Sequence, residues 1–406
     1  MSETGVFYLV YYGFEKTVIE SQVLVPLSKL KEDGLSPTIV FMEDVSSFFK
    51  SGRLRQIASL SSGFRIRILP RVPRNFLWLN SFLLFLVVLP SLLSKSVVVI
   101  HARGLQGAHV VLPMKEFFRK VRLICDVRGI EAAEYEYNVL RTKNRLPNFF
   151  ERFWVRRLSS MARQSIIGSD AVFAVSKAMK SAFSSEVLRL EKKPWEYVPC
   201  AVDVNRFSAA LKDRDAKRRE MGIQDRVVVV YSGGLAAWQE TASLARILSV
   251  MKRLEPRLFF LGLSPDAEGL KKVLTASHLS AEDFKVISLP FNQIQNALVC
   301  GDLGLLIRTP HALNRVACPT KFAEYLAAGL HVVTTPAIDD VVDLIKKNPI
   351  GTLLENIDNE TVLASELNCS LTMAKDVTRR LAATTDAARR YFDWSHYLPV
   401  FKKWYD

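Results

Sequence analysis

The amino-acid sequence predicts an α/β protein made of two doubly wound, Rossmann-like domains. Short apolar runs alternate with helical segments along the whole chain, which is typical of parallel sheets covered by helices. The chain has 406 residues, enough for two domains that each bury a full core. We therefore expect one domain over residues 1–200 and a second over residues 201–385.

Each domain is predicted to contain a parallel sheet whose strands are the short apolar runs. In the first domain the expected strands cover residues 6–12, 38–42, 64–69, 97–100, 122–125, 171–175 and 196–199. In the second domain they cover residues 227–231, 257–261, 284–288, 303–307, 330–334 and 351–354. Polar residues that directly follow these strands are expected at the carboxyl edge of a sheet, where open α/β sheets bind ligands.

One apolar segment, residues 76–93, is just long enough to cross a membrane, since a span needs about 18 apolar residues or more. Asn80, Ser81 and Pro90 weaken that interpretation. A span here would also separate two halves of one sheet, because a strand is expected directly afterwards. We expect a buried helix, and a helix lying on a membrane surface or a true span are the alternatives.

The chain is basic, with a net charge of +14, so anionic partners are expected. Basic residues gather in and before a helix expected over residues 149–163. They are Arg141, Lys143, Arg145, Arg152, Arg156, Arg157 and Arg163. This cluster is either a solvated helix face or a docking surface for anionic lipid or a diphosphate-linked acceptor.

Cysteine usage and the N-terminus bear on the compartment. The five cysteines are scattered and odd in number, which indicates a reducing compartment. The N-terminal residues carry an acid before a short apolar run, unlike a signal peptide. We expect a cytoplasmic protein. The six histidines are isolated from one another and no cysteine pair has metal-ligand spacing, so no metal site and no cofactor are expected.

The most informative stretch is residues 300–336. An apolar strand ends at Arg308, and after a polar loop Pro319 opens a helix, a position that proline suits. Thr320 and Lys321 occupy the first helical turn, where free N–H groups and the helix dipole favour an anion. Glu324 lies one turn later on nearly the same face. Cations and a helix N-terminus suit a diphosphate, and a carboxylate suits ribose hydroxyls. The alternative is a helix that caps itself with Thr320 and pairs Lys321 with a surface acid.

Within this stretch, residues 317–333 (ACPTKFAEYLAAGLHVV) resemble the donor-binding segment of the retaining family 4 glycosyltransferases of bacterial polysaccharide type, which have the GT-B fold. Two positions depart from the family pattern. Val316 stands where many members have a glutamate, and His331 stands in place of a proline. Arg308 and Asn314 match a branch with an arginine after the preceding strand and an asparagine in the loop, so the contacts to the transferred sugar are left open.

The resemblance implies two domains that face each other across a cleft, with a last helix over about residues 386–406 that packs back on the first domain. It implies donor-binding roles for Gly233, Gly234, Phe291, Arg308, Asn314, Pro319, Thr320, Lys321 and Glu324. It implies catalytic roles for Arg308, Lys321 and Asp126. Contacts to the sugar or the acceptor are implied for His101, Arg103, Arg128, Glu131 and Ser176. Taken singly, each of these last residues is equally well a strand-end polar group bonded to nearby backbone.

These observations predict a metal-independent hexosyltransferase that moves a sugar from a nucleoside-diphosphate sugar to an acceptor hydroxyl, with retention. The expected acceptor is a glycan or a lipid-linked molecule of cell-surface polysaccharide or glycolipid biosynthesis. An anionic membrane surface is a further expected partner, at the inner face of the plasma membrane, and nucleic acid is not. The alternative is a non-catalytic nucleotide-sugar-binding or anionic-membrane-binding protein on the same fold.

Overall fold

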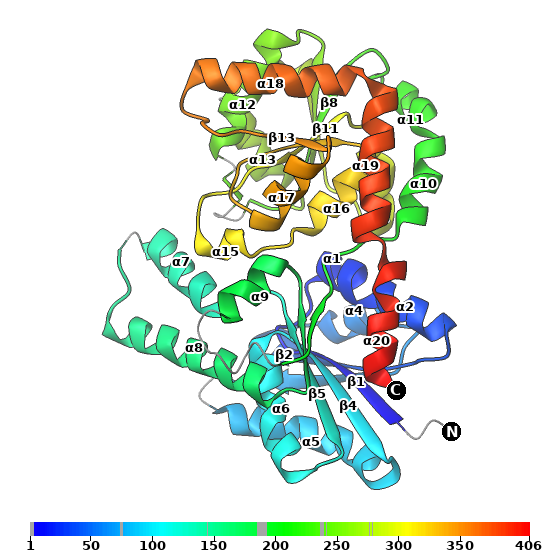
Figure 1. The fold of residues 1–406 in the computed structure, drawn as a ribbon, viewed down its shortest axis with the longest axis vertical. Coiled ribbons are helices and arrows are strands. Elements are labelled where there is room, and N and C mark those ends of the chain that lie inside the picture. The colour runs from blue at the N-terminus through cyan, green and yellow to red at the C-terminus, as the bar shows by residue number, and fades with distance from the viewer. Residues whose placement is uncertain are drawn as a thin grey trace. The chain divides into compact units, whose positions relative to one another are not determined.

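The computed structural model describes residues 4–73, 76–143, 145–184, 193–235, 239–240, 242–275, 277 and 279–406. The chain divides into two compact units (Figure 1). The first unit comprises residues 1–199 together with 395–406, and the second comprises residues 200–394. The segment that returns to the first unit thus begins at residue 395, whereas the sequence predicts that it begins near 386.

The first unit contains a seven-stranded parallel sheet with the order β3-β2-β1-β4-β5-β6-β7. Its strands are β1 (Thr4–Val10), β2 (Thr38–Asp44), β3 (Ile66–Arg71), β4 (Val97–Arg103), β5 (Val121–Val127), β6 (Ala171–Ala174) and β7 (Trp195–Tyr197). The central strands are apolar on both faces because helices cover both faces, as the near-continuous Val/Ile runs predict.

Helices of the first unit alternate with these strands. They are α1 (Lys16–Ile19), α2 (Val25–Glu32), α3 (Val45–Phe48), α4 (Arg53–Leu60), α5 (Leu77–Ser94), α6 (Leu105–Phe117), α7 (Glu131–Lys143), α8 (Phe149–Gly168), α9 (Lys177–Ser184) and α20 (Leu398–Tyr405). A π-helical turn, Glu20–Leu24, joins α1 to α2. A capping box begins α8, in which Asn148 and Glu151 each accept a hydrogen bond from the other's backbone N–H.

The C-terminal helix α20 packs on the first unit through its aromatic side. Phe401 and Tyr405 are buried, and the Tyr405 hydroxyl lies 2.9 Å from Nδ1 of His101 in β4. Lys403 forms an ion pair with Glu196 in β7. Phe401 and Tyr405 therefore pack into the core of the first unit.

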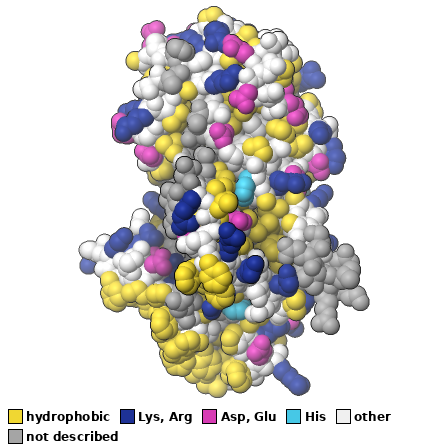
Figure 2. Space-filling model, turned by 90° about the vertical axis from the view of Figure 1, so that its left-hand side faces the viewer, with side chains coloured by type: hydrophobic (Ala, Val, Ile, Leu, Met, Phe, Trp, Pro, Cys, Tyr) yellow, Lys and Arg dark blue, Asp and Glu magenta, His cyan; other side chains and the backbone are white. Residues whose placement is uncertain are grey.

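Helix α5 differs from the buried helix that the sequence predicts. It buries one face, through Asn80, Leu84, Val88 and Leu92, and leaves a second apolar face in solvent. Trp78 is 67% exposed on that second face. In the described part of the chain, α5 is the one helix long and apolar enough to cross a membrane. Hydrophobic side chains gather at the bottom of Figure 2, the end at which α5 lies in Figure 1.

The second unit contains a six-stranded parallel sheet with the order β10-β9-β8-β11-β12-β13. Its strands are β8 (Val227–Ser232), β9 (Leu258–Leu263), β10 (Phe284–Ile287), β11 (Leu303–Leu306), β12 (His331–Thr334) and β13 (Gly351–Leu353). The helices are α10 (Val204–Lys212), α11 (Arg214–Glu220), α12 (Ala242–Leu254), α13 (Ala267–Leu274), α14 (Phe291–Leu298), α15 (Ala312–Arg315), α16 (Thr320–Ala327), α17 (Asp339–Lys347), α18 (Glu360–Lys375) and α19 (Val377–Phe392).

Two hydrophobic cores lie on the two faces of this second sheet. Val228 and Val230 of β8 belong to the core under α10, α16 and α19, and Val229 belongs to the core under α12 and α18. This division follows from the two-residue period of a strand, which sends successive side chains to opposite faces.

Helix α16 is held close to the sheet by a glycine. A Cβ added at Gly304 in β11 would lie 2.5 Å from the Tyr325 ring, so only glycine lets that ring pack against the strand. The Tyr325 hydroxyl accepts a hydrogen bond from the Ser232 N–H at 2.8 Å and donates to the Leu305 carbonyl at 3.3 Å. These contacts fix the start of α16 against the carboxyl ends of β8 and β11.

Candidate functional site

The first candidate site lies at the carboxyl edge of the sheet in the second unit, where Arg308 follows β11. Its backbone N–H donates to the Thr335 hydroxyl at 3.0 Å, and that hydroxyl donates to the Arg308 carbonyl at 2.8 Å. The side chain is 7% exposed, and its Nε and Nη1 have no hydrogen-bond partner within the described residues. Burial lowers the pKa of Arg308 to about 10, so the guanidinium remains charged at neutral pH. An uncompensated cation of this kind attracts an anion.

Lys321 lies beside it on the first turn of α16. Its Nζ donates a hydrogen bond to Oε1 of Gln239 at 2.6 Å and lies 4.6 Å from the centroid of the Tyr231 ring. Burial and the charge of Arg308 lower the pKa of Lys321 well below its ordinary value. The ammonium thus has a neutral hydrogen-bond acceptor, and an anion placed here would favour its charged form.

The turn after β8 makes room for this lysine. Gly233 has a φ of +136°, a conformation that side chains rarely adopt, and a Cβ there would lie 2.6 Å from the Lys321 Nζ. At Gly234 an added Cβ would meet none of the described residues within 4 Å. Of the two glycines in the sequence-predicted site, Gly233 therefore lies next to Lys321 at this sheet edge.

The N-terminus of α16 completes the cationic side of this site. Pro319 is the residue before the helix, with a φ of −70° and no side-chain hydrogen bond to cap the first turn. Phe322, the third residue of the helix, donates its N–H to the Pro319 carbonyl at 3.0 Å, so this N–H already has an acceptor. The backbone N–H groups of Thr320 and Lys321 precede it, at the positive end of the helix dipole.

Glu324 lies one turn deeper on α16 and is partly buried. Burial raises its pKa to about 7, although the nearby charges of Lys321 and Arg206 act in the opposite direction. The carboxyl group therefore changes charge near neutral pH. In its ionised form it can accept two hydrogen bonds from a pair of adjacent hydroxyls.

Arg206 of α10 is a site residue that the sequence did not single out. Its Nη2 donates to the Phe291 carbonyl at 2.5 Å and to Oε1 of Gln295, and its guanidinium lies 4.3 Å over the Phe291 ring. Arg206 thereby joins the start of α14 to the surroundings of Glu324. The available signal was the segment PCAVDVNRF, residues 199–207, which contains this arginine but gives no indication of its partners.

Asn314 does not join this group. It is 1% exposed, and its Nδ2 donates to the Thr309 carbonyl at 2.8 Å and to the Thr309 hydroxyl at 3.2 Å. The buried amide therefore shapes the loop before α16. The expected ligand contact of Asn314 stays a prediction, and in this structure its Nδ2 is bonded within the loop.

A second group of predicted residues lies at the carboxyl edge of the sheet in the first unit, around Asp126. This carboxylate is fully buried and accepts from Nε of Arg128 at 2.8 Å. Arg103 and His101 lie 3.8 Å and 3.4 Å from the same oxygen. Burial acts to raise the pKa of Asp126, but these three neighbours outweigh it and hold that pKa well below its usual value. Asp126 is therefore a fixed anion that orients two arginines.

His101 and Ser176 occupy places different from those expected. His101 is fully buried, stacked 4.5 Å from the Tyr8 ring and 5.5 Å from the Phe401 ring. Ser176 is 1% exposed, and its hydroxyl accepts the Met179 N–H at 2.9 Å. Both side chains belong to the protein interior, and their expected sugar or acceptor contacts stay predictions.

A cavity of about 390 Å³ opens over this edge of the first unit. Arg103, Arg128 and Glu131 line it, together with Tyr12 and Gln106. The carboxylate of Glu131 accepts from the Leu105 N–H at 2.9 Å and from Nε2 of Gln106 at 2.9 Å, at the N-terminus of α6. Burial raises the pKa of Glu131. Tyr12 and Gln106 were missed, because an apolar strand and a helix start gave no sign that they face a cavity.

Metal ligation was considered for the residues that the structure describes. They contain no group of three His, Cys, Asp or Glu side chains that could hold a metal ion. The chain contains one D-x-D string, Asp213-Arg214-Asp215. It joins α10 to α11, where Asp213 pairs with Lys217 at 3.2 Å and Asp215 is 82% exposed. Both aspartate side chains therefore lie on the surface, away from the sheet edge that carries Arg308.

Comparison with known proteins adds the fold family. No protein-family model and no curated protein matches the chain by sequence. Among solved structures, a glycosyltransferase from Rickettsia africae matches with a TM-score of 0.69 at 14% identity, covering 99% of this chain and 97% of its own. Anabaena HepE in complex with UDP matches with a TM-score of 0.69 at 15% identity, covering 98% of both chains. WaaG, a glycosyltransferase involved in lipopolysaccharide biosynthesis, matches with a TM-score of 0.61 at 13% identity, covering 95% of this chain and 94% of its own.

These likenesses establish the fold. The chain has the GT-B glycosyltransferase architecture of two Rossmann-like domains, each built on a parallel sheet with helices. The sequence-based prediction of the fold class is therefore confirmed.

Proposed function

We propose that the protein is a retaining glycosyltransferase of the family 4 type, which binds a nucleoside-diphosphate sugar at the carboxyl edge of the second sheet. One observation carries this proposal. Arg308, Lys321 and the N-terminus of α16 supply positive charge at one place, and Glu324 lies one turn deeper. That spacing suits a diphosphate followed by a ribose. The bound UDP of Anabaena HepE, a protein of the same fold, supports a nucleotide ligand.

The proposed chemistry rests on charge stabilisation. Departure of a nucleoside diphosphate leaves negative charge on its terminal phosphate, and preorganised cations lower the barrier to that step. Lys321 exchanges its hydrogen bond to Gln239 for one to a phosphate oxygen, and Arg308 contributes the unpaired Nε and Nη1. In a front-face reaction the same phosphate accepts the proton of the acceptor hydroxyl. The proposal therefore requires no side-chain base, no metal ion and no cofactor.

The acceptor is assigned to the cavity in the first unit. Arg103, Arg128 and Glu131 line it and can hold hydroxyl or phosphate groups of a glycan or lipid-linked acceptor. Asp126 was expected to be catalytic. We now assign it a positioning role, since it is fully buried and holds the two arginines in place. This assignment keeps Arg103 and Arg128 as the groups that meet the substrate.

An exposed apolar and basic surface of the first unit supports the proposal of a lipid-linked acceptor. The exposed apolar side of α5, with Trp78 and Leu93, lies on the unit that also carries the exposed Phe149 and Phe150 at the start of α8. Helix α6 contacts both α5 and α8. The solvent side of α8 also carries exposed arginines, namely Arg152, Arg156, Arg157 and Arg163. Aromatic and apolar groups beside arginines suit the interface of an anionic membrane. We propose that this surface docks on such a membrane from the cytoplasm.

Binding and transfer assays with defined donors test the proposal. The full-length protein is mixed with UDP-, GDP-, ADP- and CMP-linked sugars, and melting temperature and release of free nucleotide are both recorded. A single preferred donor that stabilises the protein and is consumed in the presence of an acceptor supports transfer. Stabilisation with no turnover for any glycan or lipid-linked acceptor supports the non-catalytic binding protein instead.

A further inference from the structure

A second basic site lies at the opposite, amino-terminal edge of the sheet in the second unit. A cavity of about 420 Å³ opens there beside the start of β8 and the residue that precedes β11. The charged side chains that line it are Arg214, Asp215, Arg218, Arg219, Asp225, Arg226, Arg257, Asp302 and Lys375. Six of them are cationic and three are anionic, so the lining carries a formal charge of +3.

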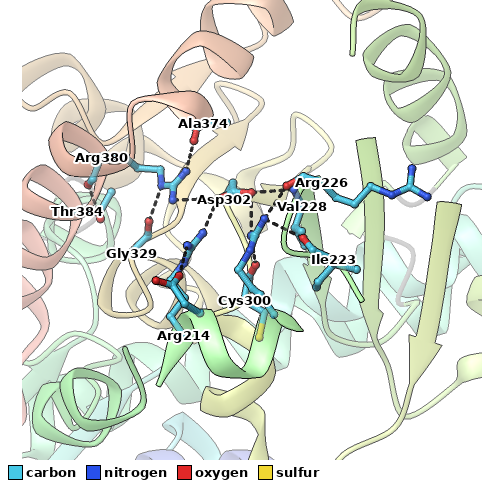
Figure 3. A network of polar contacts seen from close by, with 12 residues as sticks. Arg214, Ile223, Arg226, Val228, Cys300, Asp302, Gly329, Ala374, Arg380 and Thr384 are labelled. Atoms are coloured by element: carbon cyan, nitrogen blue, oxygen red, sulfur yellow. Dashed lines mark hydrogen bonds and ion pairs between the residues drawn. The ribbon is translucent and has the colours of Figure 1, made fainter. Parts of the chain in front are cut away.

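At the floor of this cavity, a single carboxylate is surrounded by three guanidinium groups (Figure 3). Asp302 accepts from Arg214 at 2.6 Å, from Arg218 at 3.2 Å and from the Val228 N–H at 2.8 Å. Arg380 of α19 forms a third ion pair with Asp302 at 2.9 Å. One negative charge cannot balance three positive charges, so the floor keeps a cationic excess in a poorly solvated place.

Two of these arginines are occupied by the protein backbone. Arg218 donates to the carbonyls of Cys300 at 2.7 Å and Arg226 at 2.6 Å. Arg380 donates to the Gly329 carbonyl at 3.1 Å and to the Ala374 carbonyl. These contacts tie α11 and α19 to the sheet, and they explain Arg218 and Arg380 as structural residues.

Arg214 is not explained in that way. It is 9% exposed and lines the cavity, yet its Nε has no hydrogen-bond partner within the described residues. Its second ion pair, to Asp215 at 3.6 Å, joins it to a carboxylate that is 82% exposed. Leaving the buried Nε of this charged side chain without an acceptor is costly, and the charge of an anion in the cavity would lower that cost.

The rim carries further cations, of which Arg219 is exposed. Arg257 and Lys375 pair with the same carboxylate, Glu255, and Arg226 pairs with Asp283. Helix α19 also begins at the cavity with Val377, but the carboxylate of Asp376 caps its first turn by accepting the Arg379 N–H at 3.1 Å. The cationic lining and the unsatisfied guanidinium N–H of Arg214 are the features that favour a phosphate group here.

We propose that this cavity binds a small, multiply charged phosphate-bearing anion of about the size of pyrophosphate. It is separate from the proposed donor site, because Asp302 precedes β11 and Arg308 follows that strand at its other end. Binding there would tie α11, β11 and α19 together around Asp302. The site therefore offers a way for a free phosphate compound to stabilise the donor-binding unit without occupying the donor site.

The experiment measures pyrophosphate binding by titration calorimetry in the full-length protein. Lys321→Ala serves as the background, since it removes a cation of the donor site and leaves this cavity intact. We expect pyrophosphate binding to persist in Lys321→Ala and to weaken at least tenfold when Arg219→Glu is added. Lys285→Glu, which makes the same charge change on the exposed side of β10, is the matched control and should have little effect.

Arg219 is exposed, so its replacement tests the site without disturbing the buried network. Arg257→Glu at the same rim provides a second variant, expected to weaken binding in the same direction. Absence of any pyrophosphate binding in Lys321→Ala would overturn the proposal. Equal losses from Arg219→Glu and Lys285→Glu would also overturn it, since they would show a general charge effect. The donor-site proposal is judged separately, by nucleotide binding in the unaltered protein.

Discussion

The Nζ of Lys321 lies 2.6 Å from Oε1 of Gln239, a neutral partner for a buried ammonium beside the charged Arg308. The hydroxyl of Tyr231 lies 2.9 Å from the same oxygen. This amide oxygen therefore accepts the hydrogen bond of Lys321 beside the Gly233-Gly234 turn. A phosphate oxygen at this place would replace a neutral acceptor with a charged one, which is the basis of the first prediction.

Replacing Lys321 with Ala should weaken nucleoside-diphosphate binding by about tenfold or more, because a charge-assisted hydrogen bond contributes about 1.5–3 kcal/mol. The fold should persist, since burial disfavours the charged form of this lysine, as its lowered pKa indicates. Calorimetric titration with the preferred nucleotide measures the effect. Lys285→Ala, on the exposed side of β10, is the control. An equal loss of nucleotide affinity in this variant would contradict the proposed contact between Lys321 and the diphosphate.

Replacing Gly233 with Ala should lower both stability and donor affinity. The residue has a φ of +136°, and the added Cβ would lie 2.6 Å from the Lys321 Nζ. Strain of this kind costs on the order of 1–3 kcal/mol in the free energy of unfolding, as chemical denaturation would measure. Gly234→Ala is the matched control, because its Cβ would lie more than 4 Å from every residue that the structure describes there. Equal stability of the two variants would contradict this account of the turn.

Donor affinity should rise as the pH increases from 6 to 8, through the pKa of about 7 that burial gives Glu324. The sign follows from the proposed contact: the ionised carboxylate accepts ribose hydroxyls, whereas the protonated form has lost part of that capacity. Nucleotide titrations at several pH values, compared with Glu324→Gln, isolate this group because the variant keeps Lys321. If nucleotide affinity had the same pH dependence in both proteins, Glu324 would not contact the nucleotide as proposed.

Replacing Asp126 with Asn should destabilise the first unit by about 3–5 kcal/mol, because Arg103 and Arg128 would lose their buried counter-charge. We expect a higher KM for the acceptor together with unchanged nucleotide affinity, since Asp126 acts through the arginines. Steady-state kinetics with varied acceptor concentration provides the measurement. A large loss of kcat with normal stability and normal acceptor KM would instead place Asp126 in direct contact with the reacting groups.

Reversing the charge of Arg152, Arg156 and Arg157 on α8 should release the protein from vesicles that contain anionic lipid, as sedimentation with vesicles would show. Electrostatic attraction contributes about 1 kcal/mol per basic residue near such a surface. The matched control reverses Arg246, Lys271 and Lys285, which are exposed cations of the second unit. Equal retention of both triple variants on the vesicles would mean that the arginines of α8 form only a solvated face.

The donor-site helix was predictable from the sequence because its signals are local. Pro319 marks the start of α16, and the spacing from Lys321 to Glu324 fixes which groups share a face. The doubly wound fold was predictable for the same reason, since buried parallel strands are nearly continuous apolar runs.

Other features depend on partners that are distant in the chain. The sequence cannot show that His101 meets Tyr405 of the C-terminal helix, or that Arg206 reaches Phe291. Some polar residues at strand ends lie in the interior, as Ser176 does, and others line a cavity, as Arg128 does. The sequence cannot distinguish the two kinds, because the difference depends on the packing around them. For α5, the composition predicts an apolar helix. Which of its faces is buried depends on the elements that pack against it, and the sequence does not show these.

The measurement that tests the central claim most directly is turnover of a panel of nucleoside-diphosphate sugars by the full-length protein, with nucleotide release and product anomer both followed. We predict one preferred donor, release of its nucleoside diphosphate when an acceptor is present, an anomeric configuration retained in the product, and loss of this activity in Lys321→Ala. Absence of binding and of turnover for every nucleotide sugar in the panel would contradict the account.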